Sequence, residues 1–457
     1  MTCFSRRDFI RKSALVGGAL LAPSLTSLIS CNTGHASIRR AMKGAGGYGP
    51  LFPSSDVGGI ISIPADFYAA LLSTSGEAMI GGAIPEAFDG MAAFAAGPGL
   101  VRLVRNHEIR DTPSHGARPF GANPYDRAGP GGTTTLEVRV QPDGRAEVVR
   151  QFASLTGTIV NCAGGTTPWG TWITCEETVE GTAAGWEKNH GYTFEVPASS
   201  NSTVTPVALK AMGRFEHEAV AIDPATGYVY QTEDRTPAGF YRFIPNVPGQ
   251  LEQGGKLEIL AIQGERQYDT MTNQQLLSPM KVQWLPIPHP DSDAGALESG
   301  FVYNQGLAQG AAQFARLEGC AYGDNSIFIN ATIGGNARAG QVWQYHIGRE
   351  ELQLILESPS ARVLDSPDNI CVSPRGGIVI CEDGPGIDFV RGLTRDGGMF
   401  DLVRNNLNRC EWAGVCFSPR GETLFVNIQG ETRPLQNPGR AKSMTFAIWG
   451  PWSSGAV

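Results

Sequence analysis

The sequence of 457 residues predicts an all-β protein, a six-bladed β-propeller with inserted loops and short helices. Its 58 Gly and 30 Pro residues favour many short strands joined by turns. From Leu51 onward, runs rich in Val, Ile, Tyr and Phe alternate with Gly, Pro, Asn and Asp. Two Ser-Pro-Arg-Gly turns, at positions 373 and 418, lie 45 residues apart, a spacing typical of propeller blades. A β-sandwich or two smaller barrels is the alternative architecture.

The N-terminal residues predict an export signal. Residues 1–31 combine the twin arginines Arg6-Arg7 with a broken apolar run and end in a lipobox at Cys31. This pattern predicts export by the twin-arginine (Tat) machinery and a lipid anchor through Cys31. An ordinary signal peptide, cut elsewhere, is the alternative. We expect a periplasmic protein or a membrane-anchored lipoprotein on the cell envelope. Residues 32–48 are expected to be a flexible tether, and residues 49–457 a single propeller domain.

The charge balance narrows the class of partner. A net charge of -8 argues against binding to a nucleic-acid backbone and fits a site that holds cations.

Strands are expected where apolar, β-branched or aromatic runs are bounded by turn residues. Clear examples are residues 101–105, 133–140, 327–330 and 341–346. Few stretches carry a helical apolar period, and short helices are expected at 65–72 and 271–277. Trp169 and Trp172 are expected to pack between blades.

Three segments repeat the order of turn, apolar strand and paired acids. They are residues 168–177, 224–234 and 374–383, and their acid pairs are Glu176-Glu177, Glu233-Asp234 and Glu382-Asp383. A second equivalent position, five residues before a turn, holds Glu218, Glu318 and Asp368. Equivalent positions of different propeller blades face one axis, so we expect these acids to meet.

Carboxylates gathered at one axis predict bound cations, because like charges brought together are unfavourable unless cations neutralise them. Oxygen ligands favour Ca²⁺, Mg²⁺ or Mn²⁺, whereas the thiolate of Cys175 would suit a softer transition metal. The sequence therefore predicts a mixed metal site. The alternative is that each acid pair at a strand end is a solvated part of an ordinary turn.

Two further residues could serve this site. The tripeptide Asn106-His107-Glu108 directly follows an apolar strand and could supply Glu108, although an ordinary loop is the alternative. Arg316 lies two residues before Glu318, so both side chains would point to the same side of a strand. An arginine among cations indicates a bound anion such as phosphate, although a salt bridge to a neighbouring acid is the alternative. No nucleophile-elbow, His-Glu-x-x-His or phosphate-loop motif occurs in the sequence.

At these positions the sequence resembles the PhoX-type alkaline phosphatases. The segments that carry the resemblance are 161–177, 213–235, 316–319, 340–345, 367–384 and 417–430. These segments span most of the mature chain in order, and the twin-arginine signal accompanies them.

The resemblance implies a six-bladed propeller whose axial site holds iron (two Fe³⁺ ions) and calcium and hydrolyses phosphate monoesters, the expected small-molecule substrates. It implies that Cys175 is the thiolate ligand of iron with Glu176 beside it, that Arg316 binds the phosphate, and that Arg316 and Glu318 are catalytic. The full set of expected metal ligands is Glu108, Cys175, Glu176, Glu218, Glu233, Asp234, Glu318, Asp368, Glu382 and Asp383.

Two other functions remain open from the residues alone. One is a calcium-dependent propeller lactonase or similar hydrolase, which would need one metal and no thiolate. The other is a non-enzymatic metal-binding surface lipoprotein.

Overall fold

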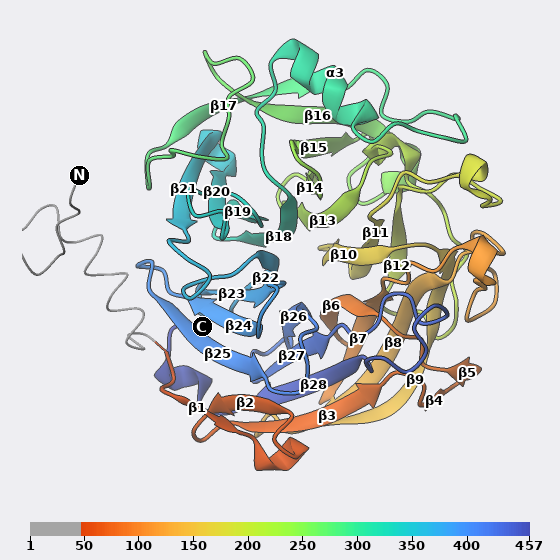
Figure 1. Cartoon of the computed structure of the whole chain (residues 1–457), viewed down its shortest axis with the longest axis vertical. Coiled ribbons are helices and arrows are strands. Elements are labelled where there is room, and N and C mark those ends of the chain that lie inside the picture. Colours follow the sequence, from red (N-terminus) through yellow and green to blue (C-terminus); the bar gives the residue numbers. More distant parts are fainter. Residues whose placement is uncertain (1–46) are drawn as a thin grey trace, which may run out of the picture.

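The computed structural model describes residues 47–457, which form sheets arranged around one central axis (Figure 1). The predicted signal peptide (1–31) and nearly all of the predicted tether (32–48) lie outside the described residues. Within residues 47–457 no helix is both long and apolar enough to span a membrane.

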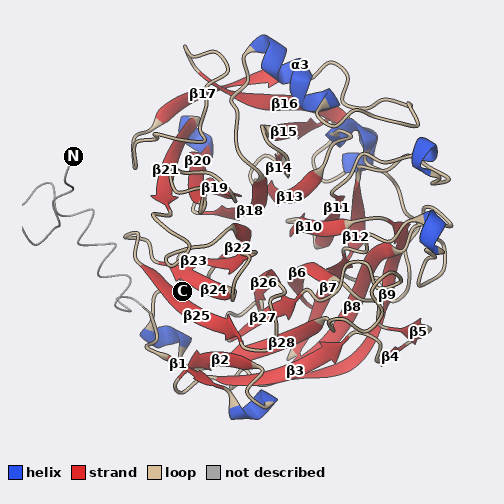
Figure 2. Ribbon diagram, in the orientation of Figure 1, coloured by secondary structure: helices blue, strands red, loops and turns tan. Residues whose placement is uncertain are grey.

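Strands dominate the chain (Figure 2). The strands of the first half are β1 (Leu51–Pro53), β2 (Ile61–Pro64), β3 (Tyr68–Thr74), β4 (Ala78–Met79), β5 (Gly82–Ala83), β6 (Phe88–Ala95), β7 (Leu100–His107), β8 (Gly131–Val140), β9 (Ala146–Thr158), β10 (Asn161–Thr166), β11 (Thr171–Glu176), β12 (Thr193–Pro197), β13 (His217–Ile222) and β14 (Val229–Glu233). Those of the second half are β15 (Phe240–Pro245), β16 (Gly255–Ile262), β17 (Met280–Pro286), β18 (Leu317–Gly323), β19 (Ser326–Ala331), β20 (Gln341–His346), β21 (Glu351–Glu357), β22 (Pro367–Val372), β23 (Ile378–Glu382), β24 (Phe389–Leu393), β25 (Met399–Asn405), β26 (Trp412–Phe417), β27 (Thr423–Ile428) and β28 (Met444–Trp449).

Helix is scarce in the described part of the chain. One α-helix, α3 (Phe301–Gln309), lies at the rim beside β16 and β17 (Figure 1). Single 3-10 turns lie at Ser55–Val57, Pro113–His115, Thr182–Ala184, Lys210–Met212, Leu251–Gln253, Ile347–Arg349 and Trp452–Ser454.

Six strands surround the axis, and each packs against the next around a closed ring. They are β6, β10, β13, β18, β22 and β26. From each of them, antiparallel strands follow outward in chain order, for example β6-β7-β8-β9. The prediction of an all-β, propeller-like fold with few helices is therefore confirmed.

Edge pairing joins some of these strand groups into larger sheets. Strand β17 pairs with β21, which unites β13–β17 and β18–β21 in one nine-stranded sheet. Near the N-terminus, β2 pairs with β25 and β3 pairs with β28. Residues from the start of the described chain thus complete sheets made mainly by its last strands.

Both short helices expected from the sequence are wrong. Residues 65–72 contain a turn and most of strand β3, whose side chains alternate between exposed Tyr68 and buried Ala69 at its start. Residues 271–277 are irregular, because Asn273 and Leu277 both have positive φ angles, of 58° each. Short apolar runs do not distinguish strand from helix, since tertiary pairing decides between them.

Apolar side chains fill the space between neighbouring sheets. Trp172 is 3% exposed and packs with Val104 of β7 and Phe194 of β12, as expected for a residue between blades. Its indole nitrogen donates to Asn106 Oδ1 at 2.8 Å, which satisfies the one polar atom of the ring.

Candidate active site

All six strands around the axis carry an irregularity near their first residues. The pairing register of each with its outer neighbour shifts two to three residues after its start. A β-bulge of this kind re-aims the side chains next to it. The second residue of each strand, which lies within the shift or at its edge, is one of Asp89, Cys162, Glu218, Glu318, Asp368 and Ala413; we call this set the inner ring.

A second set of equivalent residues lies beside the inner ring. In each strand group, the first residue of the axial strand pairs with a residue at the end of its outer neighbour, as His217 pairs with Glu233. The residue that follows this partner is one of Glu108, Glu177, Asp234, Thr332, Asp383 and Gln429; we call this set the outer ring.

The two rings, together with Glu411 directly before β26, bring ligand-type atoms together in four groups. They are Cys162 with Glu177 and Glu218; Asp89 with Glu108 and Glu411; Glu218 with Glu318 and Asp368; and Asp368 with Asp383 and Glu411. Within each group the candidate ligand atoms lie within 4.8 Å of one another. Glu218, Asp368 and Glu411 each belong to two of the four groups, so the groups form one continuous acidic site.

Close backbone packing forces these groups together. A Cβ atom on Gly319, which follows Glu318, would lie 2.5 Å from the carbonyl oxygen of Asp368 on the next strand. Gly414, with a φ of 63°, leaves room for the carbonyl oxygen of Asp89, which a Cβ would approach to 2.4 Å. Glycine therefore lets neighbouring axial strands touch at the level of the carboxylates.

The acidic site is electrostatically unfavourable as a set of bare anions. Burial raises the pKa of Glu218 and of Glu318 well above the ordinary value, and adjacent carboxylates, Asp368 among them, raise both further. Burial and then the charge of Asp383 raise the pKa of Asp368 to about 8. Burial also raises the pKa of the Cys162 thiol, and the charge of Glu218 adds to it. Cations held among these groups would favour their ionised forms.

Two arginines lie among the carboxylates, and the arginine side chains are more exposed than the carboxylates that they contact. Arg316 donates from Nε and Nη2 to both oxygens of Asp234, at 2.8 and 2.9 Å, and from Nη2 to Glu318 at 2.6 Å. Arg110 pairs with Glu108 and Glu177. The arginine side chains are 32% and 35% exposed, whereas Glu318 and Glu108 are each 4% exposed. The guanidinium groups thus lie at the open side of the site.

The first member of each predicted acid pair lies away from these groups. Consecutive strand residues point to opposite sides, so Glu176, Glu233 and Glu382 face into their own sheets while Glu177, Asp234 and Asp383 belong to the outer ring. The structure therefore does not bring Glu176, Glu233 or Glu382 to the carboxylate groups.

Each of these three carboxylates instead accepts hydrogen bonds that hold nearby loops. Glu176 accepts from the amides of Ile159, Gly191 and Tyr192 and contacts His190 Nδ1 at 2.6 Å. Glu382 accepts from the amides of Asp365 and Phe389 and from Arg391. Glu233 accepts from the amide of Gly239 and the hydroxyl of Tyr241.

The thiol that lies among the carboxylates belongs to Cys162. Cys175 is completely buried, packs with Ile173 and Phe215, and belongs to none of the four ligand groups. Cys162 occupies the same strand position as Glu218. An alignment of the strand starts could therefore have identified it. The sequence interpretation also missed Asp89, Arg110 and Glu411, which lie outside the repeated turn-strand-acid segments.

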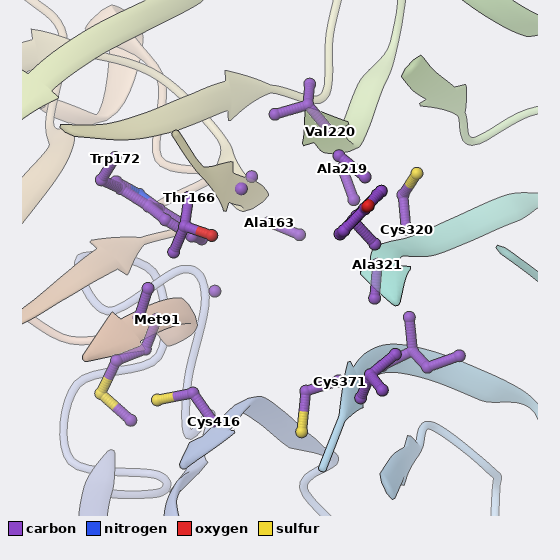
Figure 3. Close-up of a pocket in the computed structure, with 18 of the residues that line it drawn as sticks. Met91, Ala163, Thr166, Trp172, Ala219, Val220, Cys320, Ala321, Cys371 and Cys416 are labelled. Carbon is purple, nitrogen blue, oxygen red and sulfur yellow. The ribbon is translucent and has the colours of Figure 1, made fainter. Parts of the chain in front are cut away.

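A cavity of about 600 Å³ continues along the axis from the inner ring. Its wall comes from all six axial strands and includes Met91, Ala163, Ala219, Cys371 and Cys416 (Figure 3). These residues follow the inner-ring positions in sequence, so the cavity opens on the opposite side of the ring from the acid-bearing loops. Its lining within residues 47–457 contains no charged side chain, in contrast to the carboxylates and arginines at the other side.

The fold and the site define an all-β, propeller-like protein with an acidic axial site suited to cations. The family model described as alkaline phosphatase PhoX matches residues 46–431. The chain belongs to this PhoX alkaline phosphatase family, and it is an alkaline phosphatase-like enzyme.

One solved structure supports the fold, and a second shows a weaker likeness. Pseudomonas fluorescens PhoX in complex with vanadate, a transition state analogue, is 19% identical, with a TM-score of 0.66, over 90% of this chain and 98% of that one. XC5397 of Xanthomonas campestris, described as a gluconolactonase, is 12% identical, with a TM-score of 0.44, over 88% of this chain and 98% of that one. Among curated protein sequences none matches the chain.

Proposed function

We propose that this phosphatase hydrolyses phosphate monoesters at the axial site, with metal ions held by residues of the inner and outer rings and by Glu411. The observation that carries the proposal is the meeting of the four ligand groups with two partly exposed arginines. Carboxylates that attract cations and guanidinium groups that attract an anion suit a site that holds metals and a phosphate together.

The residues present fit the metals that the family resemblance implies. Carboxylate oxygens are the ligands that Ca²⁺ prefers, and a thiolate suits a transition metal such as iron. Cys162, Glu177 and Glu218 would hold iron, and the three all-carboxylate groups would hold calcium. Cys162 replaces Cys175 in this proposal, and Glu176, Glu233 and Glu382 are no longer proposed as ligands.

The protein groups at the open side would bind and orient the phosphoryl group. When bound, the cations supply neutralisation of phosphoryl oxygens and Lewis-acid activation of water. Arg316 uses Nε and Nη2 for Asp234 and Glu318, and its Nη1 makes no hydrogen bond within residues 47–457. Arg110 likewise engages its acids through Nη2. Each fork therefore keeps a donor for a phosphoryl oxygen while its carboxylate partner fixes its orientation.

The direct test is elemental analysis of the purified mature protein together with hydrolysis of p-nitrophenyl phosphate. We expect iron and calcium in the protein, loss of hydrolysis in EDTA, and loss of hydrolysis in Glu318→Ala with the fold retained. Glu258→Gln is the matched control, because Glu258 pairs with Arg242 away from the axis. An EDTA-treated enzyme that remains active would overturn the proposal. Stoichiometric iron would exclude a calcium-only lactonase, and full metal occupancy without phosphoester hydrolysis would indicate a non-enzymatic protein.

We also propose that the propeller has six blades, each starting with one axial strand. The support is that β6, β10, β13, β18, β22 and β26 all carry a register shift near their first residues, and that all but β26 hold a ligand-type side chain at the second position. The larger sheets then arise where edge strands of neighbouring blades pair.

Export by the Tat machinery and anchoring through Cys31 remain proposals that rest on the sequence of residues 1–31. Cys31→Ser is expected to release the protein from the membrane fraction, and Arg6→Lys with Arg7→Lys to keep it in the cytoplasm.

A further inference from the structure

Helix α3 places one buried aromatic residue against a side chain that follows the outer ring in sequence. Tyr303 is 1% exposed and packs among apolar residues that include Ile259 and Val302. Its hydroxyl has no hydrogen-bond partner within the described residues, so the position does not depend on that group. The aromatic ring itself is the part of Tyr303 that contacts a charged neighbour.

That neighbour is Arg235, which follows the outer-ring residue Asp234. The guanidinium carbon of Arg235 lies 5.0 Å from the centre of the Tyr303 ring, within the range of a cation–π contact. Nη1 of Arg235 also donates to the carbonyl of Pro237 at 2.6 Å. Gly300, which directly precedes α3 and has a φ of 85°, lies against this side chain, since a Cβ there would lie 2.6 Å from Arg235 Nη2. The start of α3 therefore fixes where the side chain of Arg235 lies.

Residues 234 and 235 in turn fix Arg316. The backbone amide of Arg316 donates to the carbonyl of Arg235 at 2.9 Å. The Arg316 side chain is held by both oxygens of Asp234. Arg316 also has a φ of 49°, a conformation that costs energy for a residue with a side chain. Such a conformation persists only where its surroundings specify it, and here two consecutive residues do so.

We propose that Tyr303 and Arg235 are positioning residues for Arg316, so that helix α3 sets the orientation of the group that binds the phosphoryl oxygens. The inference rests on the proposed function of Arg316. Contact passes from the Tyr303 ring to the Arg235 side chain, and from the Arg235 carbonyl and the Asp234 carboxylate to Arg316. Neither positioning residue needs to touch the substrate.

The test compares Tyr303→Ala, Tyr303→Phe and the control Tyr345→Ala in metal-loaded protein. Tyr345 is completely buried and contacts Trp284 and Tyr230, so its truncation removes the same volume without touching residues 234, 235 or 316. We expect Tyr303→Ala to raise both the KM for p-nitrophenyl phosphate and the Ki of inorganic phosphate about tenfold. Tyr303→Phe keeps the ring and is expected to restore both values, with metal content unchanged in all variants. Tyr345→Ala is expected to lower only the melting temperature.

Unchanged KM and Ki in Tyr303→Ala would overturn the inference, and so would a Tyr303→Phe variant as impaired as Tyr303→Ala. If Tyr303→Ala does not fold, Arg235→Met serves in its place, with the same expected rise in KM and Ki. Calorimetric titration of the wild type with inorganic phosphate distinguishes failure of this inference from failure of the proposed function. A wild type that neither hydrolyses the ester nor binds phosphate would overturn the proposed function and this inference with it.

Discussion

Replacement of Arg316 by Met tests the proposed role of the axial arginines most directly. The change removes three charge-assisted hydrogen bonds, of 2.8, 2.9 and 2.6 Å, to Asp234 and Glu318. Loss of one preorganised charged donor at a transition state costs on the order of 10²–10³ in rate. We therefore expect kcat/KM for p-nitrophenyl phosphate to fall by about 10²–10³. Arg316→Lys keeps the charge without the fork, and its kcat/KM is expected to lie between those of the wild type and Arg316→Met.

A stability effect of the same substitution must be separated from the catalytic one. Breaking a buried ion pair costs roughly 3–5 kcal/mol, but the Arg316 side chain is 32% exposed, so solvent screening lowers the expected cost to about 1–2 kcal/mol. Arg242→Met is the matched control. Arg242 donates to Glu258 at 2.9 and 2.6 Å, and the two side chains are 15% and 20% exposed. Steady-state kinetics and thermal melts of both variants are the measurements. A kcat/KM for Arg316→Met equal to that of Arg242→Met would refute the reasoning.

Two further predictions follow from the site and its supports. Cys162→Ser is expected to lose iron, measured by elemental analysis of the purified protein, whereas Cys175→Ser keeps it; the reverse result would restore Cys175 as the ligand. Burial lowers the pKa of His190, but the charges of Glu176 and Asp126 outweigh burial and raise it to about 9. The stabilisation from protonated His190 is therefore fully present below about pH 6.5 and lost as the pH rises through about 9. It amounts to about 3 kcal/mol, so His190→Gln should lower the melting temperature strongly at pH 6 and little at pH 10. An equal loss at both values would contradict it.

The sequence predicted the all-β, propeller-like fold because the repeated order of turn, strand and acid can be recognised directly in the residues. Aligned turns also selected Glu218, Glu318 and Asp368 correctly as neighbours, since strand starts at equivalent positions meet at an axis. Which member of each acid pair faces that axis was not visible. The answer depends on the bulge at the start of each axial strand, and a one-residue shift exchanges the two faces.

Other features depend on contacts that no local pattern records. Cys162 stands at an acid's position but is not an acid, so the repeat alone did not identify it. Asp89 and Glu411 lie outside the repeated segments and reach the site only because the ring of strands closes. Helix α3 starts at Phe301, and Gly300 before it provides no side-chain cap, so the usual start signal of a helix is missing.

The closing of the ring has a consequence for how the proposed metal site would form. Asp89 and Glu108 come from the first strands around the axis, while Glu411 directly precedes β26, the last of them. At the same junction, Gln429 donates to Asp89 at 3.1 Å, and Gln429 also accepts from the amide of Phe88 at 3.0 Å. A nascent chain cannot form this group of ligands until residues more than three hundred positions apart have met. A cation bound there would link the first and last axial strands where the ring closes. Its loss would destabilise that junction before the rest of the molecule.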